Sequence, residues 1–247
     1  MPRSIDLNCD VGELGVDHDR RLLPWVSSCN LSCGAHAGDA DSIAETLLTA
    51  LEHGVAVGAH PSYEDREGQG RRSLDLPHEQ VTAQVRQQVE WLQHLAESHG
   101  ASLHHVKPHG ALYHDINKNL ALAETVIDAI KQAAPGAMLY GMAGSLLETV
   151  CEERGVRFVP EAFADRRYED GKTLRARSHD DALLTDPKEV SNQIESLLRG
   201  EVIDVRDQCH ALHAETLCLH SDTPGAEDLA RLIHETLEEN DVRIAAP

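Results

Sequence analysis

The stretch HHVKPHGALYH, residues 104–114, indicates the fold class because it joins a short strand to a polar turn. Leu103–Val106 has the length and composition of a buried strand, and Lys107-Pro108-His109-Gly110 forms the turn after it. In barrels and open parallel sheets, sites are built at the carboxyl ends of strands. We therefore expect His109 to belong to a site. The other histidines of the stretch are expected to pack or to face solvent: His104, His105 and His114.

Short apolar runs of this kind alternate with helical patterns along the whole chain. The predicted strands are Ile5–Cys9, Ser28–Cys33, Val55–Ala59, Leu103–Val106, Met138–Gly141, Arg157–Pro160 and Thr216–Leu219. Apolar residues recur with helical spacing in Leu76–His99, Asp186-Pro187 reads as a helix start, and Thr223-Pro224 is expected to begin the last helix. Repeated strand–helix units with buried parallel strands leave two architectures open, a barrel and a doubly wound sheet.

The organisation of the chain indicates a single domain spanning residues 1–247, because no linker or low-complexity stretch interrupts the alternation. The segment Arg166–Asp186 is the least regular and is expected to contain a long loop. The N-terminus has no signal-peptide pattern, and the six cysteines are too sparse for a disulfide scaffold, so a cytoplasmic location is expected. Cys29 and Cys33 provide at most one half of a zinc site.

The charge balance excludes some classes of partner. With 22 basic and 42 acidic residues, the net charge is −20, which argues against binding to nucleic acid or to anionic membranes. An anionic substrate must therefore be held by local positive groups. Neither G-x-G-x-x-G nor a P-loop motif occurs, so a nucleotide would have to bind without these glycine fingerprints.

Titratable residues beside glycine or proline follow nearly every predicted strand. Taken singly, Asp10 and Asp39 suit helix caps and each histidine suits a core position. Their recurrence at corresponding turns favours a common site on one face of the fold. The residues concerned are Asn8, Asp10, Glu13, His36, Asp39, His60, Lys107, His109, Glu161, Asp165, Arg166, His220 and Asp222.

Several chemistries remain open for such a site. Imidazoles near carboxylates provide general acid–base groups, and Lys107 with Arg72 or Arg166 can hold a carboxylate or phosphate. Alternatively, a divalent metal that activates water can be gathered by Asp10, His36 and His60. No G-x-S-x-G motif occurs. Cys33 is next to a turn and stays an alternative nucleophile, but hydrolysis by activated water is favoured over covalent catalysis.

Six segments resemble, in order and spacing, the motifs of the LamB/YcsF family. They are IDLNCDVGE, CNLSCGAHAGDA, VAVGAHPSYEDREGQGRR, HVKPHGALYH, EAFADRRYEDGKTLRAR and LCLHSDTP. The resemblance implies an α/β fold, a distorted (β/α)7-type barrel related to glycoside hydrolase and deacetylase barrels. It also implies the role of the A subunit of 5-oxoprolinase, which opens 5-oxoproline to L-glutamate with ATP as co-substrate, beside separate B and C subunits. A divalent metal such as Mg²⁺ is compatible with this role.

The residues that match these motifs include the expected site. Those expected to be catalytic are Asp10, His36, His60, Lys107, His109 and Glu161. Those expected to bind substrate or phosphate are Asn8, Glu13, Arg71, Arg72, Tyr113, Asp165, Arg166, His220 and Asp222. Departures from the family pattern at Ala35, Gln69 and Ser221 leave the substrate preference open. Two other classes also stay open, a metal-dependent deacetylase or carbohydrate hydrolase and a non-catalytic binding subunit.

Overall fold

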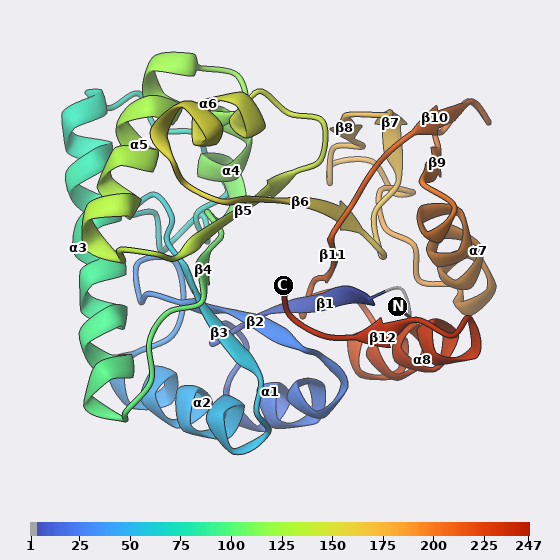
Figure 1. Cartoon of the computed structure of the whole chain (residues 1–247), viewed down its shortest axis with the longest axis horizontal. Coiled ribbons are helices and arrows are strands. Elements are labelled where there is room, and N and C mark those ends of the chain that lie inside the picture. The colour runs from blue at the N-terminus through green and yellow to red at the C-terminus, as the bar shows by residue number, and fades with distance from the viewer. Residues whose placement is uncertain (1–3) are drawn as a thin grey trace.

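Seven parallel strands form a closed barrel in the computed structural model, which describes residues 4–247 (Figure 1). The barrel strands are β1 (Ser4–Val11), β2 (Ser28–Ser32), β3 (Ala56–His60), β4 (His105–Val106), β5 (Met138–Met142), β6 (Phe158–Phe163) and β11 (Thr216–Leu219). Each strand pairs in parallel with the next, and β11 pairs with β1 to close the sheet. All seven predicted strands are confirmed, and the closure confirms the (β/α)7-type barrel over the doubly wound sheet.

Helices surround the barrel on its outer side (Figure 1). They are α1 (Val16–Leu22), a 3-10 turn η1 (Leu23–Trp25), α2 (Ala40–Glu52), α3 (His78–Ser98), α4 (Gly110–Ile116), α5 (Leu120–Ala133), α6 (Leu147–Arg154), α7 (Pro187–Leu198) and α8 (Ala226–Glu239). Two neighbouring pairs, α3 with α5 and α7 with α8, pack against each other. The short strand β12 (Arg243–Ile244) extends the sheet beside the start of β1.

Helix starts agree with the sequence in one case and differ in another. Asp186 caps α7 as predicted, because its side chain accepts hydrogen bonds from two amides in the first turn. The expected start of the last helix at Thr223-Pro224 is wrong. Gly225 takes a left-handed φ of 76°, and the Thr223 hydroxyl donates to Asp165, so α8 begins only at Ala226.

Three stretches of chain contain structure that the sequence did not indicate. The predicted loop Arg166–Asp186 contains a hairpin of β7 (Tyr168–Asp170) and β8 (Thr173–Leu174). A second hairpin pairs β9 (Glu201–Ile203) with β10 (Cys209–Ala211). The sixth strand lies later than predicted, so Glu161 is inside β6 rather than in the turn after it.

Alternation along β1 separates an apolar outer layer from a polar barrel interior. Leu7 and Cys9 belong to the core between the strands and the helices. Asn8, between them, donates to Glu161 on β6 (3.0 Å) and to Thr216 on β11 (2.7 Å). Barrel interiors are usually filled by branched apolar side chains, whereas in this one hydrogen bonds connect side chains of β1, β6 and β11.

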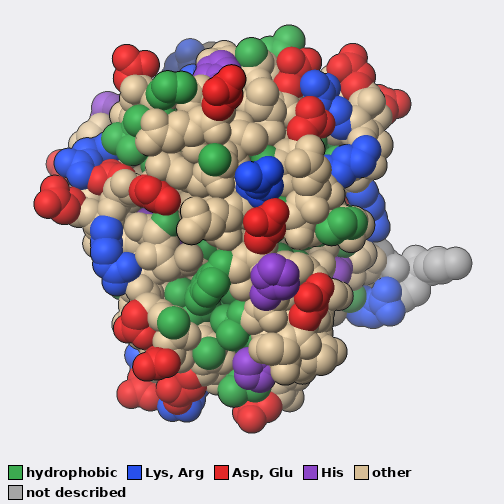
Figure 2. Space-filling view, turned by 90° about the vertical axis from the view of Figure 1, so that its left-hand side faces the viewer, with side chains coloured by type: hydrophobic (Ala, Val, Ile, Leu, Met, Phe, Trp, Pro, Cys, Tyr) green, Lys and Arg blue, Asp and Glu red, His purple; other side chains and the backbone are tan. Residues whose placement is uncertain are grey.

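The outer surface carries charges of both signs. Figure 2 shows the side of the molecule on which α3 lies, where acidic and basic side chains are interspersed and Lys and Arg form no continuous patch. In the described part of the chain, no helix combines the length and the apolar character needed to cross a membrane.

Candidate active site

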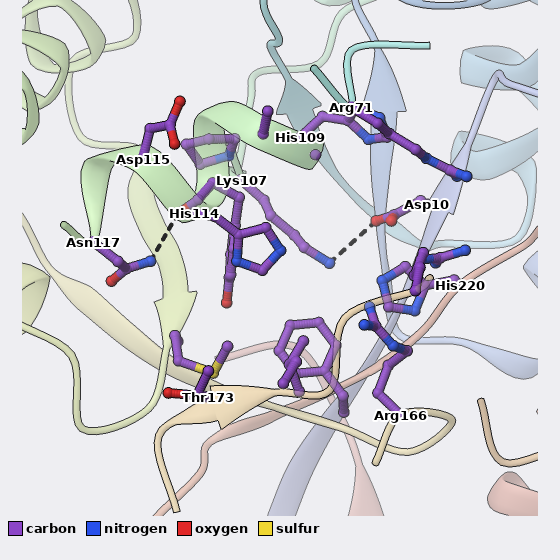
Figure 3. A pocket seen from close by; sticks show the side chains of 18 of the residues that line it. Asp10, Arg71, Lys107, His109, His114, Asp115, Asn117, Arg166, Thr173 and His220 are labelled. Atoms are coloured by element: carbon purple, nitrogen blue, oxygen red, sulfur yellow. Dashed lines mark hydrogen bonds and ion pairs between the residues drawn. The ribbon is translucent and has the colours of Figure 1, made fainter. Parts of the chain in front are cut away.

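A cavity of about 750 Å³ lies at the carboxyl end of the barrel (Figure 3). Its wall is formed by the ends of the strands, by α4 and by the segment that includes β8 and the residues after it. The predicted convergence of the turns is therefore observed, except at Asp39, which does not line the cavity and instead caps α2. The predicted site residues that line the cavity are Asp10, Glu13, His60, Arg71, Lys107, His109, Tyr113, Arg166, His220 and Asp222.

The remaining predicted residues lie outside the cavity wall. Four of them support residues that line it: Asn8 and Glu161 contact Lys107, His36 contacts Glu13, and Asp165 contacts His220. Arg72 is different, because its guanidinium pairs with Asp65 and does not reach the cavity. The expectation that Arg72 clamps a substrate is therefore wrong for this geometry.

Lys107 projects from the end of β4 and is almost completely buried. Its Nζ lies 2.9 Å from Glu161 Oε1 and 3.1 Å from Asp10 Oδ1, and it also contacts the thiol of Cys218 at 3.0 Å. Burial alone would lower the pKa of Lys107, but these neighbours outweigh it and raise the pKa well above its ordinary value. Lys107 is therefore a fixed cation at the floor of the cavity.

Asp10 is the carboxylate that joins Lys107 to the histidines. Burial opposes its ionisation, but His60 and Lys107 lower its pKa well below the ordinary value. Asn30 also donates to Asp10 Oδ1 at 2.8 Å. One carboxylate oxygen of Asp10 is thus held by Lys107 and Asn30, while Oδ2 faces His60 Nε2 at 3.5 Å.

Backbone carbonyls fix the orientation of two imidazoles at this end of the barrel. The Nδ1 of His60 lies 2.6 Å from the carbonyl of Lys107, and the Nε2 of His109 lies 2.9 Å from the carbonyl of Gln69. Because a carbonyl oxygen only accepts, each of these nitrogens carries the proton. The opposite nitrogens, His60 Nε2 and His109 Nδ1, face each other at 2.9 Å.

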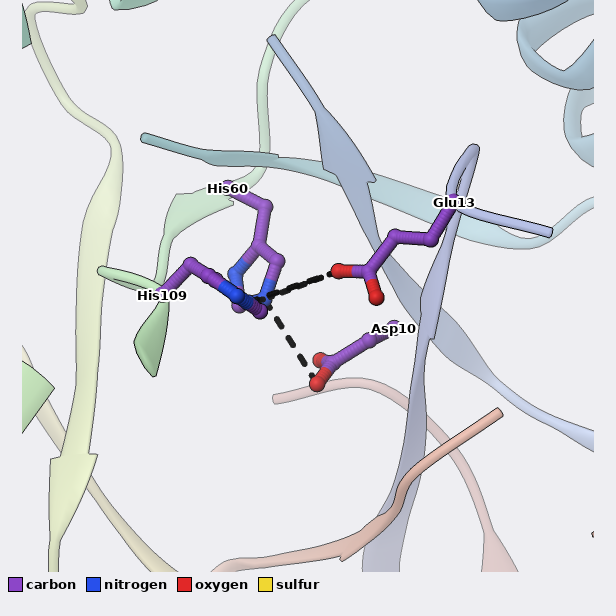
Figure 4. A group of neighbouring side chains, drawn as sticks. All are labelled: Asp10, Glu13, His60 and His109. Atoms are coloured by element: carbon purple, nitrogen blue, oxygen red, sulfur yellow. Dashed lines mark hydrogen bonds and ion pairs between the residues drawn. The ribbon is translucent and has the colours of Figure 1, made fainter. Parts of the chain in front are cut away.

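Glu13 completes this group from the turn after β1 (Figure 4). Its Oε1 lies 3.4 Å from His109 Nδ1 and 3.8 Å from His60 Nε2. His36 holds the carboxylate in place through a 3.0 Å contact from its Nε2, while its Nδ1 contacts the Ser62 hydroxyl at 2.9 Å. Burial and the charge of His60 lower the pKa of His36 to about 3, so His36 is neutral and donates this bond.

One set of side chains in this group has donor atoms close enough to bind a metal together. Donor atoms of Asp10, Glu13, His60 and His109 all lie within 4.8 Å of one another. The sequence had instead grouped His36 with Asp10 and His60. Among the residues described, Cys29 and Cys33 belong to no such group, so the suggested zinc half-site is not supported.

Three arginines provide positive charge around the cavity, and Figure 3 labels two of them, Arg71 and Arg166. Arg71 and Arg177 both pair with the half-buried Asp222, at 2.5 and 2.8 Å, and lower the pKa of its carboxyl to about 2 against the opposing effect of partial burial. Arg166 is buried and donates to the carbonyl of Arg175, but no carboxylate of the described chain forms an ion pair with it. Its Nε has no hydrogen-bond partner.

The cavity wall is more basic than the protein as a whole. Seven lysines and arginines line it, against four aspartates and glutamates, in a chain whose net charge is −20. The basic residues are Arg71, Lys107, Lys118, Arg166, Lys172, Arg175 and Arg177. This local excess of positive charge suits an anionic ligand. It agrees with the expectation that a protein of net negative charge must hold such a ligand by local positive groups.

Sequence reasoning missed several residues of the wall. Lys172, Arg175 and Arg177 come from the irregular charged segment, whose alternating basic residues were the available signal. His114, which was discounted, also lines the cavity. Cys33 does not line it, and burial raises the pKa of its thiol to about 12, which disfavours the nucleophilic thiolate.

Comparisons with known proteins agree with this arrangement. The chain is 43% identical over 249 residues to the 5-oxoprolinase A subunit of Chloroflexus aurantiacus, covering 99% of this chain and 98% of the relative. It is 41% identical over 251 residues to the protein of the same name from Bordetella parapertussis, covering 100% of both. The crystal structure of the lactam utilization protein from Thermus thermophilus matches with a TM-score of 0.91 and 38% identity, over 99% of this chain and 100% of that one.

A more distant structure shares the fold. The family 4 carbohydrate esterase from Streptomyces lividans has a TM-score of 0.53 and 9% identity, over 99% of this chain and 92% of that chain. This supports the predicted relation to deacetylase barrels at the level of fold alone. The model of the LamB/YcsF family matches residues 5–247, and the chain is therefore a member of the LamB/YcsF family.

Proposed function

We propose that this protein is the A subunit of a 5-oxoprolinase, a hydrolase that opens the lactam ring of 5-oxoproline to give L-glutamate, coupled to hydrolysis of ATP to ADP and phosphate. The names of relatives that match over the whole chain support this role. The single structural observation that carries it is the buried cation of Lys107, which faces a basic cavity beside the Asp10 carboxylate.

The two functional groups of 5-oxoproline match two regions of the cavity. The substrate carries a carboxylate, for which buried Arg166 is the suitable partner because no protein carboxylate in the described chain pairs with it. The lactam carbonyl oxygen becomes more negative during attack, and Lys107 is placed to stabilise this charge. With a volume of about 750 Å³, the cavity has room beyond this small substrate for part of a second ligand.

The chemistry requires a strong electrophile because a lactam is a stable amide. Transfer of the terminal phosphoryl group of ATP to the lactam oxygen would supply one. A first water would then add to the ring carbon and lose a proton, and the carbon–nitrogen bond would break while the nitrogen takes up a proton, which leaves an acyl phosphate. A second water would hydrolyse this acyl phosphate to the carboxylate of glutamate and inorganic phosphate. Within this site the Asp10 carboxylate, with the imidazoles of His60 and His109 beside it, is placed to activate the water.

The names of the relatives, which describe one subunit of several, imply a larger complex. We propose that B and C subunits complete it, and that Mg²⁺ accompanies the ATP phosphates, since Mg²⁺ is usually bound through phosphate oxygens and few protein ligands. The basic residues that line the cavity would then face the phosphates or the substrate carboxylate.

The test is release of glutamate from 5-oxoproline in the presence of ATP and magnesium. The chain is assayed alone, with the B and C subunits, and as Arg166→Gln in the full mixture. Activity is expected only in the full mixture, and Arg166→Gln should raise KM for 5-oxoproline at least about tenfold through loss of a charged hydrogen bond. Failure of the fully assembled mixture to release glutamate would reject the proposal.

A second candidate function rests on the group of two carboxylates and two imidazoles. These residues suit a stand-alone metal-dependent deacetylase or carbohydrate hydrolase, and the esterase barrel shares the fold. This alternative predicts release of acetate from N-acetylated sugars by the chain alone without ATP. Acetate release that requires no other protein would favour it over the 5-oxoprolinase.

A further inference from the structure

We propose that Asp10, Glu13, His60 and His109 bind one divalent transition-metal ion of the zinc class at the edge of the cavity. All four residues line the cavity, so the ion would be accessible to a ligand there. The proposal goes beyond hydrolysis of 5-oxoproline, because it concerns a resident ion that the protein holds whatever the substrate. It rests on the arrangement of the donor atoms.

The first reason is that four atoms able to coordinate a metal face one another. The backbone carbonyls of Lys107 and Gln69 fix one proton on each imidazole at the nitrogen that points away from the group. The inward nitrogens of His60 and His109 are left 2.9 Å apart. Two lone pairs at this distance repel unless a cation or a proton lies beside them, and carboxylate oxygens surround the same point.

The second reason is the spacing of these atoms. A tetrahedral ion with bonds of about 2.0–2.1 Å holds its donors about 3.3 Å apart. His60 Nε2 lies 2.9 Å from His109 Nδ1 and 3.5 Å from Asp10 Oδ2. Glu13 Oε1 lies 3.4 Å from His109 Nδ1 and 3.8 Å from His60 Nε2. These four separations therefore bracket the expected one.

The third reason is that each donor is held from behind. Carbonyls orient both imidazoles, as they do around histidine ligands of metals. His36 contacts the Glu13 oxygen at 3.0 Å and stacks on His109 with ring centroids 3.9 Å apart. His36 therefore supports the site instead of belonging to the donor set.

The donor types select the metal. Imidazole nitrogens suit Zn²⁺, Fe²⁺ or Ni²⁺, whereas Mg²⁺ prefers oxygen ligands and retains its waters. Two histidines among four donors therefore favour a transition metal. The Mg²⁺ considered from the sequence is assigned to ATP, and the protein site is assigned to zinc.

An overlapping group is less suited to a cation. Asp10, Cys218 and His220 also have donor atoms within 4.8 Å of one another. However, the ammonium of Lys107 lies 3.0 Å from Cys218 Sγ and 3.1 Å from Asp10 Oδ1, so a positive charge already occupies this region. A second cation there would be repelled.

The test measures metal binding without any substrate. Metal-free full-length protein is titrated with ZnCl₂, MnCl₂ and MgCl₂ against a chromophoric chelator, and the bound metal is counted by mass spectrometry. One equivalent of Zn²⁺ per chain is expected, bound at least about 100-fold more tightly than Mg²⁺. Substitution with Co²⁺ should give the visible bands of an ion coordinated by nitrogen and oxygen.

Matched variants locate the ion among the 16 histidines of the chain. His109→Ala should weaken Zn²⁺ binding at least about 100-fold. The nearly isosteric Glu13→Gln should also weaken it, and provides the test if His109→Ala does not fold. His114→Ala is the control, because this exposed histidine lies in α4, the helix that directly follows His109, and lines the cavity outside the donor set. The Zn²⁺ affinity of this variant should equal that of the wild type. Circular dichroism in the presence of chelator confirms that each variant is folded.

Three results would overturn the proposal. They are the absence of stoichiometric binding to the wild type, unchanged affinity in folded His109→Ala and Glu13→Gln, and loss of binding in His220→Ala alone. Because metal content is measured without 5-oxoproline or ATP, failure of the proposed enzymatic function would leave this test unaffected. Failure of metal binding would likewise leave the glutamate-release assay unaffected.

Discussion

The two ends of the barrel interior contain polar residues that are equally buried but differently paired. At the amino end, Asp6 accepts hydrogen bonds from Ser27 (2.6 Å), Ser28 (2.8 Å) and Thr216 (2.7 Å). At the carboxyl end, Lys107 faces a cavity, and the imidazoles of His60 and His109 face each other at 2.9 Å beside it. Burial of polar groups therefore does not mark a site by itself. The site is marked by buried polar groups that border an open cavity.

The largest effect is expected at the carboxyl end, from Lys107→Met. The change removes the cation that faces the cavity and leaves two buried carboxylates without their partner. Glutamate release by the full complex should fall about 10³-fold, comparable with loss of an oxyanion-binding donor. The free energy of unfolding should fall by about 3–5 kcal/mol, as when a buried ion pair is broken. Steady-state kinetics and thermal unfolding measure the two effects.

Lys118→Met is the control for this prediction. Lys118 lines the same cavity but is exposed and forms none of these buried ion pairs. Its replacement should change the stability little. Equal losses of activity for both lysines would show that only the general positive charge of the cavity matters, and would contradict the role assigned to Lys107.

At the amino end, Asp6→Ala should produce the opposite pattern. Three hydroxyls would lose their charged acceptor, and the free energy of unfolding should fall by about 3 kcal/mol. The Michaelis constant and turnover should stay at wild-type values at a temperature where the variant is folded. A lowered turnover in the folded variant would contradict the view that only the carboxyl end of the barrel contributes to activity.

Alanine substitutions at two glycines of similar backbone conformation distinguish the effect of backbone strain on stability from the effect of displacing a site residue on activity. Gly70 (φ 66°) and Gly54 (φ 69°) both take a left-handed conformation, so alanine should cost each about 1 kcal/mol in stability. Only at Gly70 would the new Cβ approach His109, at 2.9 Å from Cδ2, whereas nothing lies near it at Gly54. Gly70→Ala should reduce activity about tenfold because the new Cβ displaces the imidazole of His109. Gly54→Ala should leave activity unchanged. Equal activities would contradict this.

The position of the site at the carboxyl ends of the strands also explains which features could be predicted from the sequence. The barrel strands were recognisable because their buried runs alternate regularly with helical patterns. The turn residues Asp10, Lys107 and His109 were recognisable because they follow those strands directly. A carboxyl-end turn has a fixed position relative to its strand, so sequence order is enough to place it in space.

Contacts between distant segments were not predictable in this way. Glu161 was expected in a turn, but it lies inside β6 and neutralises Lys107 from within the barrel. Arg177 was overlooked because its relation to Asp222 depends on how the segment after β8 folds over the cavity. Whether His36 binds a ligand or supports Glu13 depends on ring orientation, which only hydrogen bonds to its neighbours define.

The amino end should also contribute to the pH dependence of stability. Burial, together with His104 and Lys107, lowers the pKa of His105 well below its ordinary value, and its Nε2 donates to Asn30 Oδ1 at 2.7 Å. The unfolded chain binds a proton at this histidine below a pH of about 6.5 while the folded chain does not, so stability falls as the pH decreases. His105→Gln should remove about 1.4 kcal/mol per pH unit from this slope. Denaturant titrations between about pH 6 and 5 test it, and an unchanged slope would contradict it.

The smallest effect is expected at Arg72, whose neighbour Arg71 provides a matched comparison. Arg71 lines the cavity and pairs with Asp222, whereas Arg72 pairs with Asp65 outside it. Arg71→Ala should lower kcat/KM about tenfold, the effect of losing one charged contact. Arg72→Ala should stay within about twofold of the wild type, because the Arg72 guanidinium does not line the cavity. Adjacent arginines of identical chemistry are thus distinguished only by the direction in which the chain points them. If both variants lost activity equally, Arg72 would have to reach the substrate in a conformation different from this one.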